Sequence, residues 1–166
     1  MTSLLELEAL LRLLVAAACG AAIGLEREWK GKQAGLRTTI LICIGATLFT
    51  LLSLSLAEAA NVENAEIGLG FRADPARIAA QIVSGIGFLG AGAILRARGQ
   101  VVGLTTAATI WVVAAIGMAA GFGAYVLAIG TTALVLFVLV PLGWWERRYR
   151  KRARSLKRSG GDPHLS

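Results

Sequence analysis

The sequence predicts an all-α membrane protein, a bundle of five transmembrane helices with its N-terminus outside and its C-terminus inside. Five apolar runs of 17 to 20 residues follow one another along the 166-residue chain, and charges are nearly confined to the segments between them. A helix needs about 20 apolar residues to cross the hydrocarbon core of a bilayer, and about 17 is the lower limit. The five runs are Ala9–Leu25, Thr38–Ala57, Ile78–Leu95, Leu104–Ala120 and Tyr125–Leu142.

The charges between the runs predict the orientation. Four basic residues lie in the first connection, two in the third and eight in the tail after Trp144, which together are 14 of the 17 Lys and Arg residues. The second connection instead carries four acidic residues against two basic ones. Cytoplasmic loops collect Lys and Arg. We therefore expect the first connection, the third connection and the tail on the cytoplasmic side.

The chain is predicted to hold one transmembrane domain, residues 1–145, followed by a basic cytoplasmic tail, residues 146–166. The formal net charge of +7 comes largely from this tail. Basic segments next to a membrane helix bind anionic lipid headgroups with about 1 kcal/mol per residue. The tail is therefore expected to bind anionic lipids and to anchor the topology, and nucleic acid is not an expected partner.

The first helix carries a small-residue motif and a charged pair. Gly20 and Gly24 are spaced so that another helix can approach their common face closely, which is how membrane helices associate. Glu8 and Arg12 are separated by four residues, so their side chains share one face of the helix. We expect them to form an ion pair.

A first group of candidate functional residues lies where the first helix ends and the second begins. It consists of Glu26, Arg27 and Arg37, and a contact between Glu26 and Arg37 across the hairpin is expected. Charge at the edge of a membrane is costly and seldom lacks a role. These three residues are therefore a candidate polar site on the cytoplasmic side.

A second candidate group opens the third helix, after the longest connection, residues 57–73, in which some short helical structure is expected. Asp74 is suited to the N-cap position and Pro75 to the first helical position. Asp74, Arg77 and Gln81 then share one face of the helix, with Asp74 as the expected partner of Arg77. The group is interpreted either as a cap and anchor or as a polar site on the outer side.

The third helix contains the densest glycine motif, Gly85, Gly87, Gly90 and Gly92. It includes a formal G-x-G-x-x-G pattern, but a dinucleotide site needs a preceding strand and an acidic residue about 20 positions on, and neither is present. Packing of small residues between membrane helices explains the motif better. We therefore expect the third helix to be the central helix of the bundle.

Two segments that open helices resemble each other. Gly31–Thr39 and Gly99–Thr106 differ by one inserted residue, which suggests a parallel repeat of two hairpins. The alternative is that glycine and threonine are simply common at helix starts.

Metal binding and catalysis receive little support from the residue pattern. Glu58, Glu63 and Glu66 could offer oxygen ligands to Mg²⁺, but separated carboxylates in a solvated connection are the simpler interpretation, so metal ligands stay unassigned. His164 is the only histidine, and no nucleophile has a base partner within the predicted helices. We expect no enzymatic activity and no cofactor.

Four segments together resemble the MgtC/SapB family of bacterial inner-membrane proteins. They are Gly20–Glu28, Ala34–Thr38, Asp74–Gly92 and Gly103–Ala108 with Trp111. The resemblance implies five spans, which agrees with the topology predicted from charge. Known members are tied to survival in low magnesium and inside macrophages, and some are proposed to restrain the F-type ATP synthase through its membrane sector.

The resemblance implies a regulatory or interaction role in Mg²⁺ or acid-stress homeostasis, with a membrane protein such as the ATP synthase as partner. The virulence-type members carry a C-terminal domain resembling the ACT fold, whereas this sequence ends in the basic tail and is expected to be a short form. The alternative is a small transporter or channel for Mg²⁺ or another ion. In that case a homo-oligomer would combine the few polar groups at membrane depth.

Overall fold

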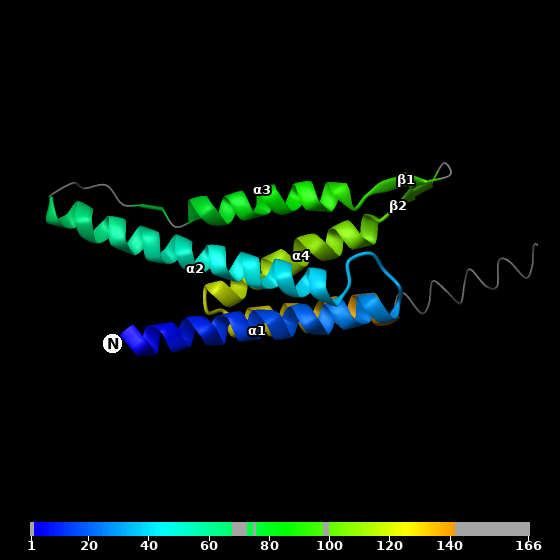
Figure 1. Cartoon of the computed structure of the whole chain (residues 1–166), viewed down its shortest axis with the longest axis horizontal. Coiled ribbons are helices and arrows are strands. Elements are labelled where there is room, and N and C mark those ends of the chain that lie inside the picture. Colours follow the sequence, from blue (N-terminus) through cyan, green and yellow to red (C-terminus); the bar gives the residue numbers. More distant parts are fainter. Residues whose placement is uncertain (1, 68–72, 75, 98–99, 142–166) are drawn as a thin grey trace, which may run out of the picture.

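The computed structural model describes residues 2–67, 73–74, 76–97 and 100–141, which form a helical bundle with one small β-hairpin (Figure 1). The predicted five helices are confirmed, whereas the basic tail lies outside the described residues. The elements are α1 (Thr2–Trp29), α2 (Leu36–Glu66), α3 (Ala76–Gly92), β1 (Leu95–Ala97), β2 (Gln100–Val102), α4 (Leu104–Gly121) and a further helix over Tyr125–Pro141, here called the C-terminal helix.

Three of the helices are long and apolar enough to cross a membrane. Their apolar segments are Leu5–Trp29, Leu36–Asn64 and Leu104–Gly121. The apolar parts of α3 and the C-terminal helix, Ala79–Gly92 and Tyr125–Pro141, are shorter. Length and composition therefore define a helical membrane protein, while the number of five spans and the direction of the termini stay predictions.

Helix α2 is longer than the sequence predicts. It has 31 residues and continues to Glu66, beyond the expected end at Ala57. At about 1.5 Å per residue the helix is about 46 Å long, which exceeds the roughly 30 Å hydrocarbon core. The helical structure expected in this connection is present as a continuation of α2, because residues 57–66 are mostly Ala and Glu, which favour helices, and contain no Gly or Pro.

Helix α3 is shorter than predicted, because it ends at Gly92 and the chain then enters the β-hairpin. The strands are antiparallel and pair Leu95 with Val102. Gly103 follows with a φ of +95°, and a Cβ at this position would overlap the carbonyl oxygen of Ala93. The hairpin therefore folds back closely onto the end of α3 before α4 begins, an arrangement that only glycine permits at this point.

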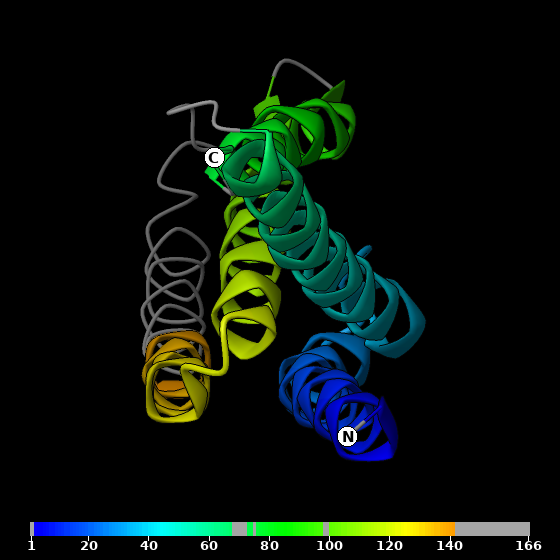
Figure 2. The same cartoon turned by 90° about the vertical axis from the view of Figure 1, so that its left-hand side faces the viewer.

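Helix α4, and not α3, occupies the centre of the bundle. It packs against α1, α2 and α3, and half of its membrane-spanning window is buried, compared with 28% for α1 and for α2. Figure 2 shows α3 at one edge of the bundle and α1 at the opposite edge, with α4 between them. The prediction of a central third helix is therefore wrong, because glycine content alone does not determine which helix faces its neighbours.

Two pairs of glycines bring α2 close to its neighbours. A Cβ built at Gly20 of α1 would lie 2.8 Å from the carbonyl oxygen of Thr39, and one at Gly24 would lie 2.6 Å from the Cα of Leu36. On the other side, a Cβ at Gly121 of α4 would lie 2.7 Å from the Cβ of Thr50. Helix α2 is thus held between the small-residue faces of α1 and α4.

The interior formed by these helices is apolar and contains small side chains. Its buried residues come from α1, α2, α4 and the C-terminal helix, and they are Ala16, Cys19, Ile23, Cys43, Val113, Ile116, Ala120 and Ala128. The hydroxyl of Thr47 crosses between helices and donates to the carbonyl oxygen of Gly117 at 2.7 Å. Close packing and a few inter-helical hydrogen bonds therefore join α2 to α4.

Helices α2 and α4 begin in similar ways, as the predicted repeat of Gly31–Thr39 and Gly99–Thr106 requires. Each has a glycine directly before its first residue, whose carbonyl accepts a hydrogen bond from the amide four residues later, at 3.1 Å for Gly35 and 2.9 Å for Gly103. Such a hydrogen bond is present at the start of any α-helix, so both the repeat and its alternative stay predictions.

Candidate functional site

The last turn of α1 carries a buried ionic cluster, here called the α1-end cluster, which consists of Glu26, Arg27 and Lys30 with Thr106 of α4. The Arg27 guanidinium donates from Nη2 to Thr106 Oγ1 at 2.7 Å. Lys30 forms an ion pair with Glu26 and donates from Nζ to the carbonyl oxygen of Leu139 at 2.7 Å. The cluster therefore joins the end of α1 to α4 and to the C-terminal helix.

Burial leaves this cluster incompletely hydrogen-bonded. Glu26 is 8% exposed and Arg27 only 2% exposed. Arg27 Nε and both carboxylate oxygens of Glu26 are buried and have no hydrogen-bond partner among the described residues, although Glu26 keeps its ion pair with Lys30. Desolvating charged groups without full compensation costs several kcal/mol. Such an arrangement is expected where the charges serve a function.

The structure separates the three residues that the sequence grouped on this side. Arg37 is exposed and makes no polar side-chain contact within the described part of the chain, so the predicted contact between Glu26 and Arg37 is wrong. Glu26 pairs with Lys30 because Lys30 directly follows the last residue of α1 and lies four residues, about one turn, after Glu26. The hairpin is closed instead by Glu28, whose Oε2 accepts a hydrogen bond from the amide of Leu36 at 2.8 Å.

Two members of the α1-end cluster, Lys30 and Thr106, were not predicted from the sequence. Lys30 could have been found, because its spacing of four from Glu26 is a standard signal for an ion pair on a helix. Thr106 gave no such signal, since it lies 79 residues from Arg27 in the chain. Only the packing of α4 against α1 brings the two together.

The outer candidate group has the geometry of a helix cap. Asp74 Oδ1 accepts a hydrogen bond from the amide of Ala76 at 2.8 Å, as a residue at the start of a helix does. Asp74, Arg77 and Gln81 are all exposed. No ion pair joins Asp74 to Arg77 in the part of the chain that the structure describes, contrary to expectation, because the Asp74 carboxylate is turned toward the helix amides.

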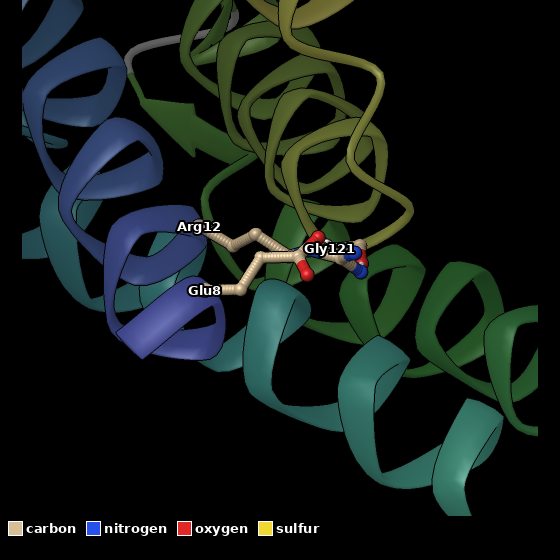
Figure 3. Close-up of polar contacts among 3 residues, drawn as sticks. All are labelled: Glu8, Arg12 and Gly121. Carbon is tan, nitrogen blue, oxygen red and sulfur yellow. Dashed lines mark hydrogen bonds and ion pairs between the residues drawn. The ribbon is translucent and has the colours of Figure 1, made fainter. Parts of the chain in front are cut away.

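At the other end of α1, the predicted pair of Glu8 and Arg12 is confirmed. Figure 3 shows that the Arg12 guanidinium also extends from α1 to the end of α4, where Nη1 donates to the carbonyl oxygen of Gly121 at 2.7 Å. A cation at the C-terminal end of a helix is favourable, because the unpaired carbonyls carry partial negative charge. This contact fastens α1 to α4 at the end opposite the α1-end cluster.

The glycines predicted for packing have contrasting surroundings. Gly20 and Gly24 lie against α2, whereas Gly90 meets only Ala107 at ordinary distances of 3.7 Å or more. At Gly85, Gly87 and Gly92 a Cβ would have no heavy atom within 4 Å. None of the four glycines of α3 therefore makes a close approach to the residues that the structure describes.

A metal site does not emerge from the described residues, which contain no group of three His, Cys, Asp or Glu side chains able to hold an ion together. The three carboxylates weighed for Mg²⁺, Glu58, Glu63 and Glu66, are exposed along the last turns of α2.

The fold and its charged contacts at both ends of α1 define the class, a helical membrane protein whose ionic groups join helices at the ends of the bundle. Comparison with known sequences specifies the family. The model of the MgtC family matches residues 13–148, and the chain belongs to this family. This agrees with the resemblance of the four sequence segments.

Several relatives are similar over the membrane domain. The chain is 49% identical over 133 residues to an Escherichia coli K12 protein named "Putative magnesium transporter YhiD", covering 80% of this chain and 59% of that protein. It is 45% identical over 127 residues to Protein MgtC of Salmonella typhimurium LT2, covering 76% and 49%. The chain thus spans about half to three fifths of these relatives' length. No solved structure matches it.

Proposed function

We propose that this protein is a non-enzymatic regulatory protein of the bacterial inner membrane that acts in Mg²⁺ or acid-stress homeostasis by binding another membrane protein. The proposal includes five spans, with the N-terminus outside and the C-terminus inside. Membership of the MgtC family and the magnesium-related name of one relative support the link to Mg²⁺. The excess of Lys and Arg in the first and third connections supports the orientation.

The observation that carries the interaction role is the close packing of α1, α2 and α4 in the interior of the bundle. Several buried threonines donate to carbonyls of their own helix, as Thr50 does to Ala46 at 2.8 Å and Thr109 to Thr105 at 2.7 Å. Glycines bring α1, α2 and α4 into close contact. A pore needs polar groups that line an opening, so a single bundle of this kind is better suited to presenting surfaces than to conducting ions.

The partner follows from family resemblance. Some members are proposed to contact the membrane sector of the F-type ATP synthase, and we extend that proposal to this chain. Exposed apolar residues along α1 and α3, such as Leu14, Phe88 and Leu89, provide surfaces on which another membrane protein could pack.

A Mg²⁺ transporter is the second candidate. The name of the Escherichia coli relative favours it, and so does the incompletely hydrogen-bonded ionic cluster at the end of α1. In this alternative, several copies of the chain would assemble so that polar groups from each copy line a common path.

Two measurements on the same protein separate these functions. The purified chain is reconstituted in vesicles that contain a Mg²⁺-sensitive dye, and the same gene is tested for growth at low Mg²⁺ in a strain that lacks its own copy. Regulation predicts restored growth without Mg²⁺ flux above that of protein-free vesicles. Protein-dependent flux would favour the transporter, and failure to restore growth despite normal membrane levels would contradict a role in Mg²⁺ homeostasis.

The topology has its own test. Reporter fusions after Gly68 and after Arg154 are expected to give opposite signals, because an odd number of spans separates the two points. The same signal at both fusions would contradict the five-span arrangement.

A further inference from the structure

The first turn of α4 is an uncapped helix N-terminus. Gly103 precedes it and provides no side chain to cap the free amides. Backbone hydrogen bonding of the helix begins with the amide of Ala107, which donates to the carbonyl oxygen of Gly103 at 2.9 Å. The amides of Leu104, Thr105 and Thr106 have no acceptor among the described residues. Such amides give a helix N-terminus partial positive charge that favours anions.

A buried cation lies against this same turn. Arg27 is 98% buried, and its Nη2 donates to Thr106 Oγ1 at 2.7 Å. Its Nε is buried without a hydrogen-bond partner. Because positive charge is unfavourable at the N-terminal end of a helix, this placement calls for a negative group nearby.

The described neighbours do not supply that negative group. Glu26 is the one carboxylate of the α1-end cluster and is ion-paired with Lys30. Glu26, Arg27 and Lys30 therefore have a net charge of +1, and the N-terminal end of α4 adds further positive potential. Glu26 also acts electrostatically on Arg27, but one carboxylate cannot balance two cations, so the cluster keeps an excess positive charge among the described residues.

The hydroxyl of Thr106 connects the buried cation to the helix end. Its oxygen accepts a hydrogen bond from Arg27, so its hydrogen remains available to donate to a ligand. Leu104 and Thr105 are exposed, which lets an anion approach their amides from outside the bundle. Free amides at a helix N-terminus, supported by an arginine, are a common way to bind phosphate.

We propose that the first turn of α4 binds a phosphate group, held by the free amides and the Thr106 hydroxyl and balanced in charge by Arg27. This turn opens a membrane-spanning helix, so it lies near the depth of lipid headgroups. The phosphate belongs either to an anionic phospholipid or to a soluble phosphate compound. The proposal does not depend on the regulatory function, and its test does not use growth.

The test measures thermal unfolding of the purified full chain in detergent while a probe is titrated. One arm adds sodium phosphate, with sodium chloride of equal ionic strength as reference. The other adds phosphatidylglycerol, with diacylglycerol, which lacks phosphate, as reference. The variants are Arg27→Gln and Thr106→Val, and the matched control is Arg37→Gln, which removes an exposed positive charge near the same end of the bundle.

We expect at least one probe to raise the unfolding midpoint of the parent and of Arg37→Gln. Its apparent affinity should fall by about tenfold or more in Arg27→Gln and Thr106→Val, because each loses part of a charge-assisted contact. A response to phosphatidylglycerol alone identifies a lipid headgroup, and a response to sodium phosphate a soluble compound. Thr106→Val keeps the test valid if Arg27→Gln does not fold.

Two results would overturn the proposal. Neither probe stabilises the parent, or a probe stabilises the parent and all three variants equally, which would assign its binding to another basic part of the chain.

Discussion

The hairpin of α1 and α2 and the hairpin of α3 and α4 both contain a glycine-rich helix, but their glycines have different surroundings. In the first hairpin, Gly20 and Gly24 admit the backbone of α2 to distances that a Cβ would block. In the second, Gly85 and Gly87 have no heavy atom within 4 Å of an added Cβ. A glycine motif thus permits close packing, and the facing helix decides whether the packing occurs.

The space beside α3 shows the same difference. An apolar groove of about 560 Å³ lies between α2 and α3, and its lining includes Gly45, Phe49, Gln81, Gly85 and Leu89. The helices of the first hairpin are therefore closely packed, whereas α3 of the second hairpin borders an open groove. Substitutions at equivalent kinds of position in the two hairpins should have unequal effects on stability.

The largest difference is expected between Gly24→Leu and Gly87→Leu. Leucine at residue 24 would overlap the backbone of α2 at Leu36 and should reduce the free energy of unfolding by about 3 kcal/mol or more. Leucine at residue 87 meets open space and should not reduce it; because leucine favours helix more than glycine does, it should raise it by up to about 1 kcal/mol. Unfolding of the two purified variants in detergent measures both, and equal losses would contradict the comparison.

A smaller difference is expected between two alanine variants, one of which should lose stability while the other gains it. Gly117→Ala places a Cβ 2.9 Å from that of Ala46 and should cost about 2 kcal/mol. Gly85→Ala meets no neighbour and should stabilise α3 by up to about 1 kcal/mol, because alanine favours helix more than glycine does. Thermal unfolding midpoints should move in opposite directions. If both midpoints fall, Gly85 packs against something other than the described residues of a single chain.

The third prediction concerns the cations at the two hairpins. Arg12→Gln removes the ion pair with Glu8 and weakens the contact with the Gly121 carbonyl, and it should cost about 1–2 kcal/mol. Arg77→Gln, at an exposed position at the start of α3, should be nearly neutral. A parallel unfolding series checks this. A loss for Arg77→Gln as large as that for Arg12→Gln would indicate a partner for Arg77 that the described residues do not provide.

The smallest effect is expected at the cap of α3. Asp74→Asn should be nearly neutral for stability, because Asn caps a helix about as well as Asp, whereas Asp74→Ala should cost about 1 kcal/mol. Growth at low Mg²⁺, measured together with membrane protein levels, distinguishes a structural cap at Asp74 from a functional carboxylate. Full growth with Asp74→Asn and with Arg77→Gln would leave the outer group as structural support only.

Helix number, the start of α4 and the pair of Glu8 and Arg12 could be predicted because they depend on local patterns. Apolar length defines a span, a glycine before Leu104 marks a helix start, and a spacing of four residues places two charges on one face. The end of α2 at Glu66 was missed because the expected helix ended with its apolar run at Ala57, although the Ala and Glu residues that follow favour helix. The β-hairpin was missed because three-residue strands give little signal.

The sequence by itself determined that this chain is a membrane protein of the MgtC family with five helices, since hydropathy and the family motifs are properties of contiguous segments. Only the tertiary structure decided that α4 is central, that α3 lies at the edge and that Arg27 meets Thr106. The physical reason is that every membrane helix has an apolar surface, whether that surface faces lipid or another helix, so hydropathy does not identify the faces that pack together. Which faces meet therefore depends on shape and on single polar contacts between residues far apart in the chain.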